Sequence, residues 1–133
     1  INSSPVRDRR DYLDILRNQT TGTSLRLQVL REGGPVKLEA TPEPFSDTDA
    51  RALLERRWGF SAAQTAQGVV VRQARADGPA EFLRQGDRIT AVGSAEIRTM
   101  EDFLQAFRKE RMSGQVLLQV VRNGKGYYAR LIP

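Results

Sequence analysis

The stretch Gln85-Gly-Asp-Arg-Ile-Thr-Ala-Val-Gly93 decides the fold of this chain. Its central residues, Asp87-Arg-Ile-Thr-Ala-Val92, have the composition of a short β-strand bounded by glycines. Further strands are predicted upstream at Gly68-Val-Val-Val-Arg72 and Phe60-Ser-Ala-Ala63. Between the strands, Gly78-Pro-Ala80 predicts a short helical turn, because Pro is well placed in the first turn of a helix. The centre of the chain is therefore expected to consist of short strands separated by turns.

On the C-terminal side of this centre, the sequence predicts a helix followed by a hairpin. Thr99 can cap a helix over residues 100–110, whose third position is Asp102. The alternating strand Val116-Leu-Leu-Gln-Val120 follows, and Asn123-Gly124 predicts a hairpin turn because both residues tolerate positive φ. The apolar side chains of the helix recur at spacings of three and four, at Met100, Phe103, Leu104 and Phe107.

On the N-terminal side, residues 41–47 form a Pro-containing linker, and a helix begins after it. Ser46 with Asp49 three residues later makes a capping box for a helix over residues 47–57. The helix is expected to end near Trp58-Gly59.

An internal repeat organises the whole chain, because residues 1–42 align with residues 92–133 without a gap at a constant offset of 91. Each copy reads as a short extended piece, an amphipathic helix and two strands joined by a turn. Asp8 and Asp11 take the capping positions in the first copy, and its hairpin turn is predicted at Gly33-Gly34. Identical pairs include Arg7/Arg98, Asp11/Asp102, Leu13/Leu104, Arg17/Arg108, Leu27/Leu118, Gln28/Gln119, Val29/Val120, Arg31/Arg122 and Gly33/Gly124.

The ordered set of motifs over residues 58–133 resembles a PDZ domain. The motifs are Gly68-Val-Val-Val, Gly78-Pro-Ala, Gln85-Gly-Asp-Arg-Ile-Thr-Ala-Val-Gly, Ile97-Arg-Thr-Met-Glu-Asp-Phe and Val120-Val-Arg-Asn-Gly-Lys. Their order is similar to that of the bacterial PDZ domains on high-temperature-requirement (HtrA/Deg) serine proteases. The resemblance implies an α+β fold: a PDZ-like, partly open antiparallel β-barrel or sandwich capped by two helices. It divides the chain into residues 1–45, the C-terminal half of a first repeat with a helix and a hairpin, and residues 46–133, a complete domain.

The resemblance also implies a peptide-binding site. An extended peptide adds to the open edge of a strand beside a helix, and a loop of apolar-Gly-apolar form receives the terminal carboxylate on its N–H groups. Met100 would read the third residue from the peptide's end, and Leu104 and Phe107 would line the groove, while Phe103 and Ala106 would turn to the core. The residues assigned to the site are Arg57, Trp58, Gly59, Phe60, Ser61, Ala62, Met100, Leu104 and Phe107.

Several of these assignments have a plainer alternative, and Arg57, which could attract the carboxylate, could equally be a solvated side chain. Trp58 and Phe60 have the character of core residues, and Gly59 that of a helix C-cap. The spacing of the helix residues Met100, Leu104 and Phe107 also fits simple core packing.

The composition excludes several kinds of chemistry. Among the 133 residues there is no His and no Cys, which rules out thiolate or imidazole zinc sites, disulfides and His-dependent nucleophilic catalysis. We therefore expect no catalytic residue, no metal and no cofactor in this chain. The 21 Lys and Arg exceed the 16 Asp and Glu, but they are scattered, so no nucleic-acid partner is expected. The first residues show no signal-peptide pattern, and no apolar run reaches the length of a membrane span.

The expected partners are C-terminal or unfolded hydrophobic peptides, together with a protease domain in the parent polypeptide. The resemblance places the protein in the periplasm or cell envelope. Two other functions remain open: a scaffold or assembly module without a free ligand, and the tandem PDZ region of a membrane-embedded site-two metalloprotease.

The incomplete first copy carries apolar side chains that lack half of a core: Tyr12, Leu13, Leu16, Leu25, Leu27 and Val29. Burying a large aliphatic side chain contributes roughly 1.5–3 kcal/mol, so we expect this half to be covered. The cover would be the missing chain of the parent, the complete copy, or a second molecule in a homo-oligomer with domain exchange.

Overall fold

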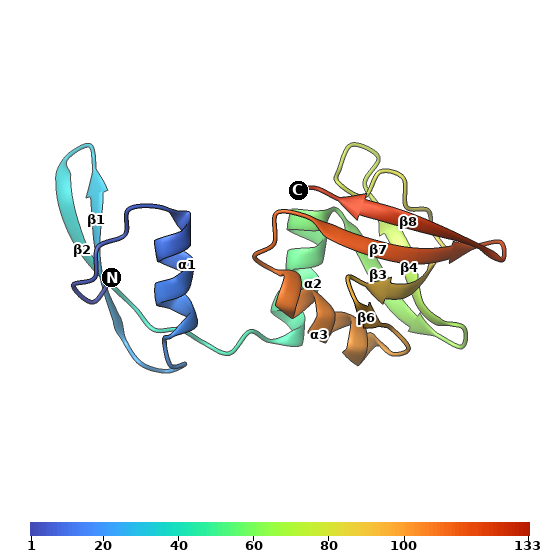
Figure 1. Cartoon of the computed structure of the whole chain (residues 1–133), viewed down its shortest axis with the longest axis horizontal. Coiled ribbons are helices and arrows are strands. Elements are labelled where there is room, and N and C mark those ends of the chain that lie inside the picture. Colours follow the sequence, from blue (N-terminus) through green and yellow to red (C-terminus); the bar gives the residue numbers. More distant parts are fainter. The chain divides into compact units, whose positions relative to one another are not determined.

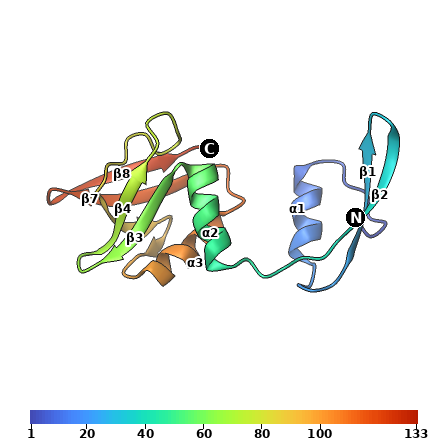
Figure 2. The same cartoon turned by 180° about the vertical axis from the view of Figure 1, so that it is seen from behind.

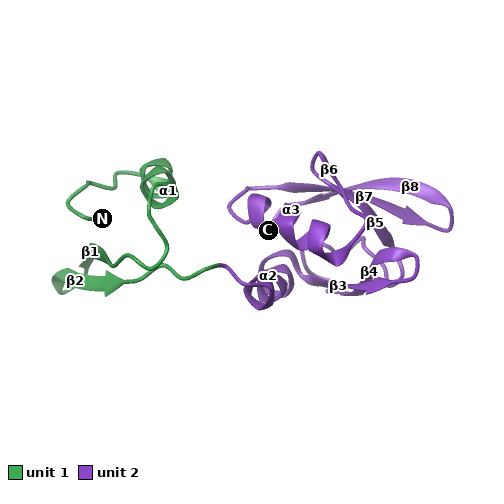
Figure 3. Cartoon of the chain, turned by 90° about the horizontal axis from the view of Figure 1, so that it is seen from below, with its two compact units in different colours: residues 1–44 green, residues 45–133 purple.

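The computed structural model describes all residues 1–133 and separates into two compact units, Ile1–Pro44 and Phe45–Pro133, called unit 1 and unit 2 below (Figure 3). None of the helices combines the length and the apolar character that crossing a membrane requires.

Unit 2 is built on a sheet with the strand order β3-β4-β5-β7-β8 (Figure 1). These strands are β3 (Phe60–Thr65), β4 (Gly68–Ala74), β5 (Arg88–Val92), β7 (Val116–Arg122) and β8 (Lys125–Leu131), and the short β6 (Ala95–Glu96) pairs with β5. All pairings are antiparallel. The edge strands β3 and β8 do not pair with each other, so the sheet stays open instead of closing into a barrel. The predicted α+β class is confirmed in this open form.

Two helical elements complete unit 2 (Figure 2). The first is α2 (Asp47–Leu53), which continues as a π-helical turn, η1 (Leu54–Trp58); the second is α3 (Met100–Glu110). Ser46 and Thr99 each cap a helix, and each forms the reciprocal capping box with the aspartate three residues later, as predicted. The first helical segment ends at Gly59, whose φ of +77° is the left-handed conformation of a C-cap glycine.

The core of unit 2 is centred on an aromatic cluster between the helices and the sheet. Trp58, Phe60, Phe103 and Phe107 are all 2% exposed or less. The Phe103 and Phe107 ring centroids are 4.9 Å apart, and Trp58 meets Phe107 edge-on at 6.2 Å. The cluster joins the end of η1, the start of β3 and the buried face of α3 into one hydrophobic core.

The Gly-Asp segment before β5 is held by a buried ion pair. Asp87 is 1% exposed and accepts hydrogen bonds from Arg122 Nε at 2.7 Å and Nη2 at 2.6 Å. A third bond comes from the backbone N–H of Arg84 at 2.8 Å. Burial alone raises the pKa of Asp87, but these hydrogen bonds and the nearby guanidinium charges outweigh it and hold that pKa below its ordinary value. Asp87 therefore ties the loop before β5 to the end of β7.

Unit 1 consists of α1 (Arg9–Arg17) and a separate hairpin of β1 (Leu25–Arg31) and β2 (Gly34–Ala40). Its elements reproduce the repeat found in the sequence: α1 begins 91 positions before α3, and β1 and β2 have the bounds of β7 and β8 shifted by 91. The hairpin register also repeats, since Leu25 pairs with Ala40 as Val116 pairs with Leu131. The repeat thus exists at the level of hydrogen-bonded structure.

Two local predictions are wrong in detail. Residues 78–80 form no helix; two successive turns, closed by Glu81 N–H to the Gly78 carbonyl and Leu83 N–H to the Ala80 carbonyl, replace it. Such three-residue spacings do not propagate a helix over so short a segment. In the first hairpin Arg31 pairs with Gly34, so the turn lies one residue earlier than predicted, at residues 32–33. This places it 91 positions before the Asn123-Gly124 turn, which is confirmed with φ values of 50° and 75°.

Candidate functional site

One edge of the unit 2 sheet is open to a further strand. β3 pairs with β4 alone, and its register shifts between Ser61 and Ala62. Both residues are half-buried, so they are neither sealed in the core nor fully exposed. Unpaired main-chain groups along an edge strand are the element that strand addition requires.

The loop before β3 is tightly packed. Trp58, Gly59 and Phe60 are buried, in agreement with their alternative reading as core and C-cap residues. The Gly59 N–H donates to the Leu54 carbonyl at 2.9 Å, which completes the end of η1. In this conformation the glycine N–H is occupied, so a carboxylate nest with that N–H free, as the loop pattern implied, is not formed here.

Arginines surround this loop. Arg57 donates to the Ser113 carbonyl at 3.0 Å, and its guanidinium carbon lies 5.2 Å from the centroid of the Trp58 ring. Arg75 is also close to the loop: a Cβ on Gly59 would be 3.2 Å from its Nε. The main chain fixes this approach, since the Arg75 N–H donates to the Gly59 carbonyl at 2.8 Å. The loop therefore has a positive charge beside it in Arg75, a residue that the sequence analysis missed.

The helix residues assigned to the groove are more deeply placed than expected. Leu104 and Phe107 are each 2% exposed, as buried as Phe103 and Ala106, which are 0% and 5% exposed. The expected division of α3 into a groove face and a core face is therefore not seen in this structure. For Phe107 the cause is the aromatic cluster, because its ring packs against both Trp58 and Phe60, with centroid distances of 6.2 and 5.9 Å.

Met100 is different, since it stands half-buried at the first position of α3. Its N–H donates to the side-chain oxygen Oε1 of Gln64 on β3 at 2.7 Å. This hydrogen bond connects the open strand to the start of α3. Gln64 was also missed by the sequence analysis, because nothing local marks a glutamine as the partner of an amide 36 positions away.

No group of three or more acidic, His or Cys side chains that could hold a metal ion is brought together in the chain.

The site described here consists of an edge strand, a glycine loop flanked by arginines, and the first turn of a helix. These are the elements of a main-chain recognition site for extended peptides.

The sequence matches the PDZ domain family over residues 56–131. The match covers more than half of the chain, and the chain therefore belongs to the PDZ domain family. PDZ domains are non-catalytic modules that bind peptides in protein–protein interactions.

Among solved structures, the chain is similar to the PDZ domain of EpsC from Vibrio cholerae, residues 204–305 of that protein. The identity is 18%, the TM-score is 0.44, and the match covers 65% of this chain and 90% of the EpsC chain. No curated protein gives a significant match to the sequence.

Proposed function

We propose that unit 2 binds C-terminal or exposed apolar segments of other polypeptides by strand addition to the free edge of β3. The observation that carries this proposal is the unpaired edge of β3, which begins directly after the Gly59 loop. The main chain of the peptide would provide affinity, and the side chains beside the edge would select its sequence.

The charges at the loop favour a terminal carboxylate. Arg75 packs against Gly59, and Arg57 lies on the adjacent helical turn. A peptide carboxylate arriving at this loop would replace part of its lost hydration by charge-assisted hydrogen bonds. Met100, at the start of α3, offers an apolar surface, so an apolar residue is expected at the third position from the peptide's end.

Ligand binding requires a rearrangement of the closed site. Leu104 and Phe107 are buried, and the bond from Gln64 to Met100 spans the gap between β3 and α3. A strand added between these two elements would displace that hydrogen bond. The apparent affinity would then equal the affinity of the open form multiplied by the fraction of molecules that are open.

The test is a calorimetric titration of the whole chain with peptides that end in an apolar residue, each as the free acid and as the C-terminal amide. The free acid is expected to bind more tightly. Arg75→Ala should weaken binding of the free acid about fivefold, the scale of an exposed ion pair, while leaving the amide unchanged. Arg130→Ala on β8, also exposed, is the matched control and should have no effect. Equal affinity for acid and amide would remove the carboxylate from the proposal.

The closed site favours a second candidate function, a scaffold or assembly module without a free ligand. In that case Leu104 and Phe107 are permanent core residues, and no peptide of either kind shifts the amide resonances of β3. Chemical-shift mapping separates the two functions, because strand addition must move the resonances of Ser61 and Ala62, which border the free edge.

We further propose that residues 46–133 form the complete PDZ domain and residues 1–45 the C-terminal half of a preceding one, within an HtrA-type periplasmic serine protease. The order of elements and the repeated register support this division. A parent polypeptide with a His-Asp-Ser protease domain would agree with the proposal. Flanking membrane spans with a His-Glu-x-x-His motif would instead indicate a site-two metalloprotease.

A further inference from the structure

The apolar face of unit 1 is only partly covered: Leu25 is buried and Leu13, Leu16 and Leu27 are half-buried, but Tyr12 and Val29 are exposed where their counterparts in unit 2 are buried. Tyr12 on α1 is 42% exposed, whereas Phe103, its equivalent 91 positions later, is 0% exposed. Val29 on β1 is 36% exposed against 1% for Val120. Tyr12 and Val29 in unit 1 therefore lack the packing that buries their equivalents in unit 2, although the helix and hairpin of the two units have the same register.

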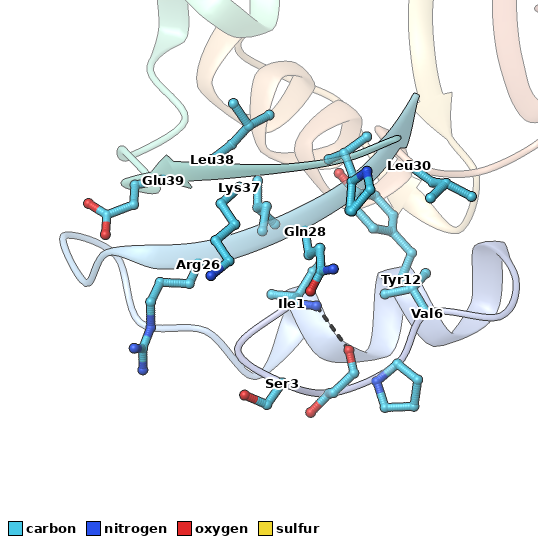
Figure 4. Close-up of a pocket in the computed structure, with 15 residues that line it drawn as sticks. Ile1, Ser3, Val6, Tyr12, Arg26, Gln28, Leu30, Lys37, Leu38 and Glu39 are labelled. Carbon is cyan, nitrogen blue, oxygen red and sulfur yellow. Dashed lines mark hydrogen bonds between the residues drawn. The ribbon is translucent and has the colours of Figure 1, made fainter. Parts of the chain in front are cut away.

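This face borders a groove between the N-terminal segment, α1 and the hairpin (Figure 4). The groove has a volume of about 1230 Å³, and Tyr12, Leu30 and Leu38 are among its lining residues. Leu30 is 83% exposed and Leu38 is 38% exposed. Polar side chains such as Gln28 and Lys37 also line the groove, so it offers a surface of mixed character with exposed apolar side chains for another polypeptide.

The second copy of the repeat shows what covers such a face. In unit 2, β5 pairs with the edge of β7, with Ile89 opposite Val120 and Val92 opposite Leu118. In unit 1 the equivalent edge belongs to β1, which pairs with β2 alone. A strand in the same register would lie opposite Val29 and would end beside Leu27.

The first residues of the chain already occupy the end of that strand position. The Asn2 N–H donates to the Arg26 carbonyl at 2.8 Å, just as the Gly93 N–H donates to the Leu117 carbonyl at 2.7 Å. Asn2 and Gly93 also share a left-handed conformation, with φ values of 47° and 58°. Ile1 therefore stands where Val92, the last residue of β5, stands in unit 2.

A charged residue at the end of β1 identifies a further requirement. Arg122, at the end of β7, forms the buried ion pair with Asp87. Arg31 ends β1 at the equivalent position, is exposed, and has no carboxylate partner. A segment that covers unit 1 in the manner of unit 2 would bring an aspartate to this guanidinium.

We propose that unit 1 is completed by a polypeptide segment with the helix-and-strand order of residues 45–92, whose last strand runs along β1 into Ile1 and whose aspartate pairs with Arg31. This inference rests on the proposed division of the chain into a half repeat and a complete one. A second copy of the chain cannot supply the segment by exchange. Each copy of the chain has two C-terminal halves, in unit 1 and at the end of unit 2, but one N-terminal half, in unit 2. If that N-terminal half moved to unit 1 of a second copy, it would leave the C-terminal half of its own unit 2 uncovered.

The test is a fusion in which a duplicate of residues 45–91 is joined directly to Ile1 of the full chain, with hydrogen exchange measured on β1. The β1 amides that β2 leaves unpaired should exchange at least about tenfold more slowly than in the unfused chain. Arg31→Ala in the fusion should reverse much of this protection. Arg26→Ala, on the exposed start of β1, is the matched control and should retain it.

Two outcomes would overturn the proposal. One is unchanged exchange of β1 in the fusion while unit 2 remains folded, which would mean that this face does not accept such a segment. The other is protection of β1 in the unfused chain that rises with protein concentration, accompanied by a dimer in sedimentation. That result would assign the face to a second copy. The peptide-binding function of unit 2 is measured separately, by its response to free-acid peptides, so either proposal can fail without the other.

Discussion

Replacement of Asp87 by Asn tests whether the buried ion pair holds the Gly-Asp segment in place. The isosteric amide keeps one oxygen but presents N–H groups where the carboxylate accepted hydrogen bonds from Arg122 and Arg84. Each bond to a charged group contributes about 1.5–3 kcal/mol, and breaking a buried pair costs about 3–5 kcal/mol. Because the Arg122 side chain retains 21% exposure, water can partly replace its partner. We expect a loss near the lower bound, about 3 kcal/mol in the free energy of unfolding of unit 2.

The assay is urea denaturation followed by Trp58 fluorescence. Trp58 is the single tryptophan of the chain and is fully buried in unit 2, so its emission reports the unfolding of this unit. Asp77→Asn, which removes an exposed carboxylate from the turn after β4, is the matched control and should change stability by less than about 0.5 kcal/mol.

The Asp87→Asn variant also tests how the stability contributed by Asp87 depends on pH. The pKa of Asp87 in the folded protein lies below its ordinary value, so its stabilising contribution is present above the pKa of the unfolded chain. The contribution decreases as the pH falls through the folded pKa, where the native carboxylate becomes protonated. The stability difference between the wild-type protein and Asp87→Asn should therefore be full at neutral pH and shrink in acid. A difference below about 1 kcal/mol at neutral pH, or one that stays constant into strong acid, would refute this account of the Gly-Asp segment.

Three further perturbations test the site and the core. Gly59→Ala should destabilise unit 2 by about 1–2 kcal/mol in the same fluorescence assay, because the φ of Gly59 is +77° and the new Cβ would be 3.2 Å from Arg75 Nε. The control is Gly114→Ala, whose new Cβ would have no atom within 4 Å; equal destabilisation by the two variants would contradict the argument. Phe103→Ala should lower the free energy of unfolding by about 4 kcal/mol, because it leaves a cavity in the aromatic cluster, whereas Tyr128→Ala should leave it unchanged because Tyr128 is 72% exposed. A small effect of Phe103→Ala would show that the core collapses around the cavity. Gln64→Ala should tighten peptide binding about threefold in calorimetry, because the closed site loses the hydrogen bond between Gln64 and Met100. Gln67→Ala in the neighbouring turn is the control and should leave the affinity unchanged. Weaker binding by Gln64→Ala would mean that Gln64 contacts the ligand.

Helix starts and the hairpin turn of unit 2 were predictable from the sequence, because short-range backbone chemistry governs them. Ser46 and Thr99 bond to backbone three residues away, and the Asn123-Gly124 turn needs only residues that tolerate positive φ. The repeat was predictable for the same reason, since each copy carries the same local signals in the same order. The PDZ family membership follows from motifs of this kind.

Tertiary structure alone decided how the candidate site is arranged. Arg75 reaches Gly59 only because β4 pairs with β3, and Gln64 reaches Met100 across 36 positions of sequence. The burial of Leu104 and Phe107 was likewise undecided, because groove-facing and core-facing residues recur at the same spacing on an amphipathic helix. Long-range pairing selects among arrangements that short-range patterns leave equivalent.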